Sequence, residues 1–223
     1  MFRLGRLLSL SLAYSALLVS SPTAQPSLEG EALARAVQQH YNTVRDFTAD
    51  FEQAYVGGAL KRRTVETGTV AIRKPGRMRW DYLTPEPKQF ISDGTRIYFY
   101  VPADKQVRVS AMPAADRAPT PILFLAGRGD LLRDFRVEET TPPGGLDGVR
   151  ALKLEPRQRE AEYASLTLVV DATSFQMRQL VVVDAQGGSS TFTFRNLREN
   201  TGVADNRFTF RIPRGVDVIN QGQ

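Results

Sequence analysis

Alternation of apolar and polar residues with a period of two is the feature that most restricts the fold of this chain. Short segments of this kind recur about every 8 to 12 residues, and turn signals such as Asp93-Gly94 and Gly187-Gly188 separate them. Such spacing predicts a curled antiparallel sheet or barrel of about 10 to 11 strands. The predicted strands cover residues 47–52, 65–72, 76–82, 88–92, 95–101, 106–110, 135–140, 149–155, 164–171, 175–184 and 189–198.

Two segments depart from this alternation. An opening helix is predicted because apolar residues recur at helical spacing from Leu33 to Val44, with Ser27 as a possible cap. Residues 118–132 combine prolines with an apolar cluster and predict one or two short helices, split at 127–129. A single curled sheet with one apolar face needs a cover, and these helices are the material available to supply it.

The first residues predict an export signal. Arg3 and Arg6 form a short positive region, residues 7–20 are mostly apolar, and small residues follow. We expect a signal peptide over residues 1–24, cleaved near residues 21–24, and a single domain over residues 25–223 that is soluble in the periplasm. The alternative is a membrane anchor, but the apolar run is shorter than the roughly 20 residues that span a bilayer.

The composition argues against most enzyme classes. The chain has no cysteine and one histidine, His40, so a thiolate nucleophile, a His/Cys metal site and a Ser-His-Asp triad are not expected. We find no G-x-S-x-G, phosphate-binding loop or dinucleotide fingerprint. A pair of carboxylates acting as acid and base needs no local motif and stays open. We therefore predict no catalytic residue, no metal site, no cofactor and no enzymatic activity.

The net charge sets a limit on partners. The formal charge of +5 falls to about +3 without Arg3 and Arg6, which is too weak and dispersed to indicate nucleic-acid binding. The absence of cysteine also excludes a lipid anchor on an N-terminal cysteine. We expect a monomer.

Large apolar side chains gather on one face of the predicted strands. A filled core and a ligand cavity give the same periodicity, so both interpretations stay open from the pattern alone. The residues predicted to line this face are Met78, Trp80, Tyr82, Phe90, Ile97, Phe99, Leu168 and Phe192.

The stretch 68–100 carries a more specific signal. It contains Lys74-Pro75, then Trp80, then a hairpin over 85–94 with the sequence PEPKQFISDG, and then the aromatic strand end 98–100. These motifs closely resemble the outer-membrane lipoprotein carrier family (LolA). The resemblance extends, in order, to 44–47 with 50–53, to the apolar stretch 121–126, and to 208–210 with 213–216.

The resemblance implies an incomplete antiparallel β-barrel whose apolar cavity is covered by the N-terminal helix and short lid helices. It implies a periplasmic carrier that binds acylated lipoproteins. An inner-membrane ABC release complex supplies them, and an outer-membrane receptor or the membrane itself accepts them. The family has an arginine before the proline that bonds the lid backbone. Here Lys74 stands there and Arg73 precedes it, so either is the candidate latch. The lid residues are Ile122, Leu123, Phe124 and Leu125.

Three alternatives share this fold or compartment. Outer-membrane lipoprotein receptors would need the missing cysteine, and envelope-stress regulators that sense lipids or lipoproteins carry a second domain for which about 200 residues leave no room. A lipid hydrolase would need a nucleophile and a base, and the sequence indicates neither.

Overall fold

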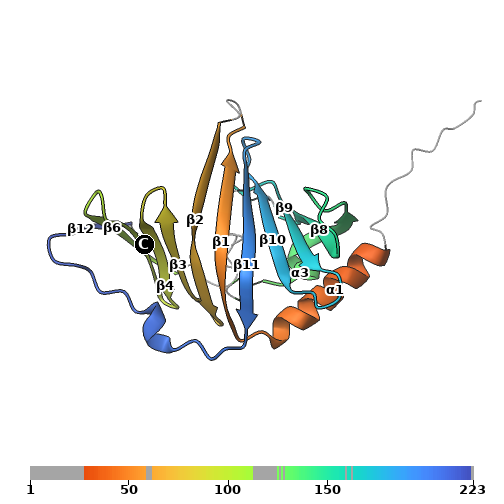
Figure 1. Cartoon of the computed structure of the whole chain (residues 1–223), viewed down its shortest axis with the longest axis horizontal. Helices are drawn as coiled ribbons and strands as arrows, with labels where there is room; N and C mark the ends of the chain where they lie inside the picture. Colours follow the sequence, from red (N-terminus) through yellow and green to blue (C-terminus); the bar gives the residue numbers. More distant parts are fainter. Residues whose placement is uncertain are drawn as a thin grey trace, which may run out of the picture.

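The computed structural model describes residues 28–58, 62–112, 125, 127, 129–158, 160–161 and 163–221. Within these residues, twelve strands form one sheet in the order β12-β6-β5-β4-β3-β2-β1-β11-β10-β9-β8-β7 (Figure 1). The elements are α1 (Leu28–Thr43), β1 (Asp46–Val56), β2 (Arg63–Arg73), β3 (Arg77–Thr84), β4 (Lys88–Asp93), β5 (Arg96–Val101), β6 (Gln106–Ala111), α3 (Leu131–Asp134), β7 (Phe135–Thr140), β8 (Val149–Pro156), β9 (Ser165–Asp171), β10 (Met177–Val183), β11 (Ser189–Glu199), η2 (Asp205–Phe208) and β12 (Asp217–Asn220).

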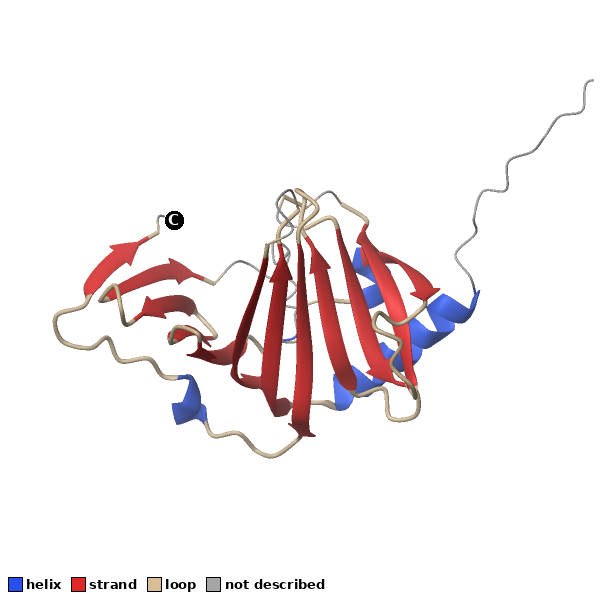
Figure 2. Cartoon of the chain, turned by 45° about the horizontal axis from the view of Figure 1, so that its top comes forward, coloured by secondary structure: helices blue, strands red, loops and turns tan. Residues whose placement is uncertain are grey.

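The predicted mainly β fold is confirmed. All eleven predicted strands are present, and every neighbouring pair among β1 to β11 is antiparallel. The sheet curls but does not close, because β7 and β12 are its two edges. Figure 2 shows the curvature, with α1 at one end and β12 at the other.

Helix α1 covers one end of the sheet. Leu33, Val37 and Tyr41 recur every four residues, and all three are buried, whereas Glu31 and Arg35 pair on the exposed side. The helix contacts α3, β7 and β8. This stripe of apolar residues is what the predicted spacing requires, because residues four apart lie on one helix face.

We call the sheet face that carries Trp80 and Phe192 the inner face. Its core is one cluster that joins α1 to strands β1, β2, β3 and β7 to β11. At its centre, the ring of Phe51 meets Trp80 edge-on at 5.0 Å and Tyr82 at 4.9 Å, and Trp80 meets Phe192 at 5.6 Å. Edge-to-face pairs of this kind are favoured because the positive ring edge meets the negative ring face.

Gly68 makes room for this aromatic cluster. Gly68 pairs with Phe51 across β1 and β2, and a Cβ at this position would lie 2.8 Å from the Phe51 ring and 2.1 Å from the carbonyl oxygen of Asp81. Any larger residue would therefore push against both the ring and the neighbouring strand. The Phe51 ring can pack over β2 because Gly68 has no side chain.

The outer face carries a second apolar cluster that the alternation did not predict. Ile91, Tyr98 and Val107 are buried there, and Phe210 and Val216 of the C-terminal segment pack against them. That segment leaves β11, runs along the sheet past η2 and ends in β12, which pairs with β6 in parallel (Figure 1). Strand β12 was missed because its four residues show no alternation and its partner is distant in the sequence.

Asp46 anchors the start of this C-terminal segment. Its carboxylate is buried and accepts hydrogen bonds from the backbone N–H groups of Thr201 and Gly202, and from the Thr201 hydroxyl. A buried carboxylate is tolerated only when such donors replace the lost water. Residues 200–202 are therefore fixed beside the junction of α1 and β1.

None of the helices that the structure describes is long and apolar enough to cross a bilayer.

Candidate functional site

The structure brings the eight residues predicted for the cavity onto the inner face. Trp80 pairs with Phe90, which in turn pairs with Phe99, so these three rings lie in one row across β3, β4 and β5. Met78 and Ile97 lie in the next row, on either side of Ser92. Leu168 and Phe192 pair with Leu180 from opposite sides on the other half of the sheet.

The eight residues divide into two groups by exposure. Met78, Trp80, Leu168 and Phe192 are buried within the main core cluster. Tyr82, Phe90, Ile97 and Phe99 are only half-buried, although they share the same face. We call Phe90, Ile97 and Phe99 the open strip. The ligand-binding role of all eight residues stays a prediction.

The open strip has polar margins. Tyr82 lies beside it and donates a hydrogen bond from its hydroxyl to Gln53 at 2.8 Å, and burial raises the pKa of this phenol. Lys88 lies 4.5 Å above the Tyr82 ring and pairs with Glu66. On the far side, Phe99 pairs with Arg108 of β6. An apolar strip between polar margins suits a ligand with an apolar chain and a polar head.

Of the predicted lid residues, Leu125 is described and Ile122, Leu123 and Phe124 lie outside the described residues. Leu125 is helical and fully buried, and it belongs to the main core cluster. Its carbonyl oxygen accepts a hydrogen bond from the hydroxyl of Tyr41 in α1. Sequence reasoning did not assign Tyr41 to the site, because the two residues are 84 positions apart.

The two candidate latch residues point in opposite directions, Arg73 from the end of β2 and Lys74 from the turn that follows it. Lys74 lies on the inner side, with its ammonium group 3.4 Å from the centre of the Tyr41 ring and bonded to the Tyr41 carbonyl oxygen. Arg73 instead donates a hydrogen bond to the carbonyl oxygen of Val203 and pairs with Asp205 at 3.0 Å. Of the two candidates, Lys74 is therefore the one whose side chain faces α1.

Lys74 also contacts Gly127, two positions after Leu125. A Cβ on Gly127 would lie 2.7 Å from Cδ of Lys74, so the aliphatic part of the lysine passes directly over this backbone. Burial lowers the pKa of Lys74 to about 8, and the charge of Glu199 partly opposes this shift. Glu199 also lies 3.2 Å from His40.

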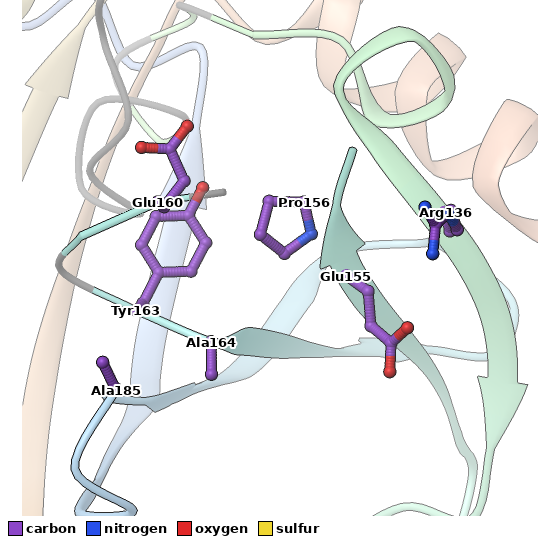
Figure 3. Close-up of a pocket in the computed structure, with 7 residues that line it drawn as sticks. All are labelled: Arg136, Glu155, Pro156, Glu160, Tyr163, Ala164 and Ala185. Atoms are coloured by element: carbon purple, nitrogen blue, oxygen red, sulfur yellow. The ribbon is translucent and has the colours of Figure 1, made fainter. Parts of the chain in front are cut away.

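Within the described part of the chain, no group of three or more His, Cys, Asp or Glu side chains could hold a metal ion. A pocket of about 380 Å³ lies away from the predicted residues (Figure 3). In this view, Glu160 and Tyr163 lie on one side of Pro156, and Arg136 and Glu155 lie on the other. Sequence reasoning missed this pocket, because it combines a loop with strand ends that show no common motif. It is lined by Arg136, Glu155, Pro156, Glu160, Tyr163, Ala164 and Ala185.

The fold and the site together define an open, curled β-sheet protein that buries most of one apolar face and leaves the rest accessible beside a basic residue. The model of the family "Outer membrane lipoprotein carrier protein LolA" matches residues 42–211. This chain belongs to that family.

Individual relatives agree with this assignment. The outer-membrane lipoprotein carrier protein of Chromohalobacter salexigens is 30% identical over 214 residues, which cover 95% of this chain and 97% of the relative. The protein of the same name from Bordetella avium is 29% identical over 177 residues, which cover 79% of this chain and 81% of the relative. A crystal structure of an uncharacterized conserved protein from Thermus thermophilus superimposes with a TM-score of 0.53 at 13% identity, and the match covers 86% of this chain and 99% of that one. This last likeness concerns the fold alone.

Proposed function

We propose that this protein is a periplasmic carrier that binds the acyl chains of lipoproteins and transfers them from the inner to the outer membrane. The donor is an inner-membrane ABC release complex, and the acceptor is an outer-membrane receptor or the membrane itself. Residues 1–24 serve as the export signal, and residues 25–223 form the carrier domain. The family match over residues 42–211 and the accessible apolar strip support this proposal.

The need for a carrier follows from the hydrophobic effect. Three long acyl chains expose roughly 40 methylene groups, and each contributes about 0.8 kcal/mol on burial. Leaving them in water costs on the order of 30 kcal/mol. A lipoprotein therefore crosses an aqueous compartment only when another apolar surface covers its chains.

The open strip is the observation that carries the proposal. Phe90 and Phe99 continue the row that starts at the fully buried Trp80, and Ile97 lies in the next row, yet each of the three keeps part of its surface exposed. Full burial of such side chains contributes about 1.5 to 3 kcal/mol, so covering the minor part of each that is still exposed contributes about 0.5 kcal/mol. An acyl chain that lies along the open strip would gain this free energy of burial. One end of the chain would then lie near the rings of Phe51 and Trp80.

The position of Leu125 adds a requirement for release. Leu125 occupies the inner core, so the lid and a deeply inserted acyl chain would compete for the same apolar surface. Such competition reduces the net affinity by the free energy of displacing the lid. A carrier needs this reduction, because a cargo that is bound too tightly cannot be delivered.

A release assay tests the function. Inner-membrane vesicles that hold the ABC complex and a labelled triacylated lipoprotein are mixed with the purified protein, and soluble cargo is counted after ATP is added. We expect Phe99→Asn to reduce the soluble cargo several-fold, because it places an amide on the strip. Leu83→Asn is the matched control, since Leu83 is 57% exposed and projects from the other side of β3.

Trp80 provides a second readout as the single tryptophan of the chain. Its emission should change when cargo binds, because it contacts Phe51 and Phe192 on the inner face. Soluble cargo that appears without any carrier, or a carrier that fails to retain cargo at saturation, would contradict the proposed function. Ester hydrolysis of the cargo would instead favour a lipid hydrolase, and cargo retention without delivery would favour a sensor.

A further inference from the structure

The open strip ends at a charged side chain. The row that contains Phe90 and Phe99 continues to Arg108, because Phe99 pairs with Arg108 across β5 and β6. On its other side, Arg108 pairs with Ile219 of β12, which is 39% exposed. Residues that pair across neighbouring strands project from the same face of a sheet. Arg108 therefore lies on the inner face between two apolar side chains, at the end of the sheet that β6 and β12 form (Figure 1).

The charge of Arg108 is not compensated. Within the part of the chain that the structure describes, its guanidinium group is exposed and has no hydrogen-bond or ion-pair partner. Asp217 lies in the next row of the same face, where it pairs with Gln106, and it forms no ion pair with Arg108. At the opposite margin of the open strip, Lys88 is neutralised by Glu66 at 2.6 Å. Of these two cations, Arg108 is therefore the one whose charge is available to a ligand.

We propose that the open strip and Arg108 together bind a single-chain amphiphile with an anionic head, such as a fatty acid or a lysophospholipid. The guanidinium group binds the carboxylate or phosphate oxygens through paired hydrogen bonds, for which its planar fork is suited. The chain lies over Phe99 and Phe90 and points toward Trp80. This inference rests on the proposed function, because it uses the same apolar strip, and it adds a class of ligand that is not a lipoprotein.

The dimensions of the row suit such a ligand. From Arg108 to Trp80 the row crosses three strand spacings, or about 14 Å, which a long acyl chain spans in its extended form. Burial of the chain supplies most of the affinity, and an exposed ion pair adds a smaller contribution that favours anionic heads. A neutral head at the same place leaves Arg108 without a partner.

Calorimetric titration of the purified mature protein tests the proposal with three amphiphiles, each below its critical micelle concentration. They are myristate, myristoyl lysophosphatidylglycerol and neutral monomyristoylglycerol, which share one saturated chain and differ in the head. We expect the wild type to bind an anionic amphiphile about 3- to 10-fold more tightly than the neutral one. Arg108→Gln should abolish this preference and leave the affinity for the neutral amphiphile unchanged. The two anionic arms show whether the carboxylate or the phosphate is the better head.

The matched control is Arg96→Gln. Arg96 is also exposed and lies on β5, but it precedes Ile97 and therefore projects from the opposite face. This exchange lowers the net charge by the same amount as Arg108→Gln, and it should keep the preference for anionic heads. Arg108→Lys should keep part of the preference, because it retains the charge without the planar fork. Unfolding midpoints confirm that each variant is folded.

Three results would overturn the inference. The first is equal affinity of the wild type for anionic and neutral amphiphiles, or binding of none of them. The second is an equal loss of preference in Arg96→Gln and Arg108→Gln, which would indicate a general effect of net charge. The third is binding of inorganic phosphate alone as tightly as the amphiphile, because the strip would then contribute nothing. A failure of the proposed function differs from all three, since the wild type would then take up no lipoprotein from inner-membrane vesicles, whatever it binds in calorimetry.

Discussion

Replacing Gly68 by alanine should disturb the packing of the inner face, although it adds only one methyl group. The new Cβ would lie 2.1 Å from the Asp81 carbonyl oxygen and 2.8 Å from the Phe51 ring. The first contact involves backbone, so it cannot be relieved by a rotamer change. Strands β2 and β3 would have to move apart locally, and the Phe51 ring would have to tilt away from Trp80.

The magnitude combines three contributions. Overpacking of a filled core costs about 1 to 3 kcal/mol, and losing an aromatic edge-to-face contact costs about 0.5 to 1.5 kcal/mol more. Replacing glycine in a strand returns about 0.5 to 1 kcal/mol, because alanine loses less backbone entropy on folding. The net destabilisation is therefore about 1 to 4 kcal/mol. For a domain of about 200 residues, this lowers Tm by about 2 to 15 °C.

The assay is urea unfolding followed by Trp80 fluorescence, with Gly57→Ala as the matched control. A Cβ on Gly57 would find its nearest neighbours at 3.9 Å, which is ordinary contact. The Gly68 variant should unfold at lower urea and show altered native emission, whereas the control should do neither. Equal midpoints for the two variants would refute the claim that the Phe51 ring depends on an empty position in β2.

Three further predictions concern other parts of the molecule. The pKa of Lys74 is lowered to about 8 in the folded state, so between about pH 8 and 10.5 the unfolded state binds one more proton than the folded state. The free energy of unfolding of the wild type, measured by urea titrations at each pH, should therefore rise by about 1 to 2 kcal/mol from pH 7 to 9.5 relative to Lys74→Met. Asp46→Ala should lower the free energy of unfolding in urea by about 2 to 4 kcal/mol, because the backbone N–H groups of Thr201 and Gly202 lose a charged acceptor. The control is Asp50→Asn, at an exposed carboxylate that accepts a hydrogen bond from Asn196, and it should change this free energy by less than about 0.5 kcal/mol. Mass spectrometry of the periplasmic protein should show a mature N-terminus near residues 22–25, and an intact N-terminus in the membrane fraction would contradict export.

Local pattern was enough to predict most of the sheet, because burial on one face imposes a period of two wherever a strand forms. The same argument failed for the outer face of β4 and β5. There the sequence around Phe90-Ile91 and Tyr98-Phe99 is apolar on both faces, a signal that both are covered. The cover is the C-terminal segment with Phe210, and no local rule predicts which distant segment will cross a given face.

The site shows the same division between local and distant information. Alternation alone predicts that Arg73 and Lys74 lie on opposite faces, but it does not say which of them faces α1. The structure settles the direction of each side chain through Val203 and Asp205 on one side and Tyr41 on the other. Tyr41 itself reads as an ordinary buried position of α1, because the acceptor that gives its hydroxyl a task lies far along the chain.

The open strip and the lid contact have magnitudes that suit a transfer protein. Covering the exposed parts of Phe90, Ile97 and Phe99 contributes about 1 to 2 kcal/mol in total, and leaving the buried carbonyl oxygen of Leu125 without its donor costs about 1 to 3 kcal/mol. In the proposed carrier, these two contributions would oppose each other on loading, because an acyl chain that reached the core would have to displace Leu125. In the proposed carrier, two contributions of similar size would let a modest input of free energy load the cargo.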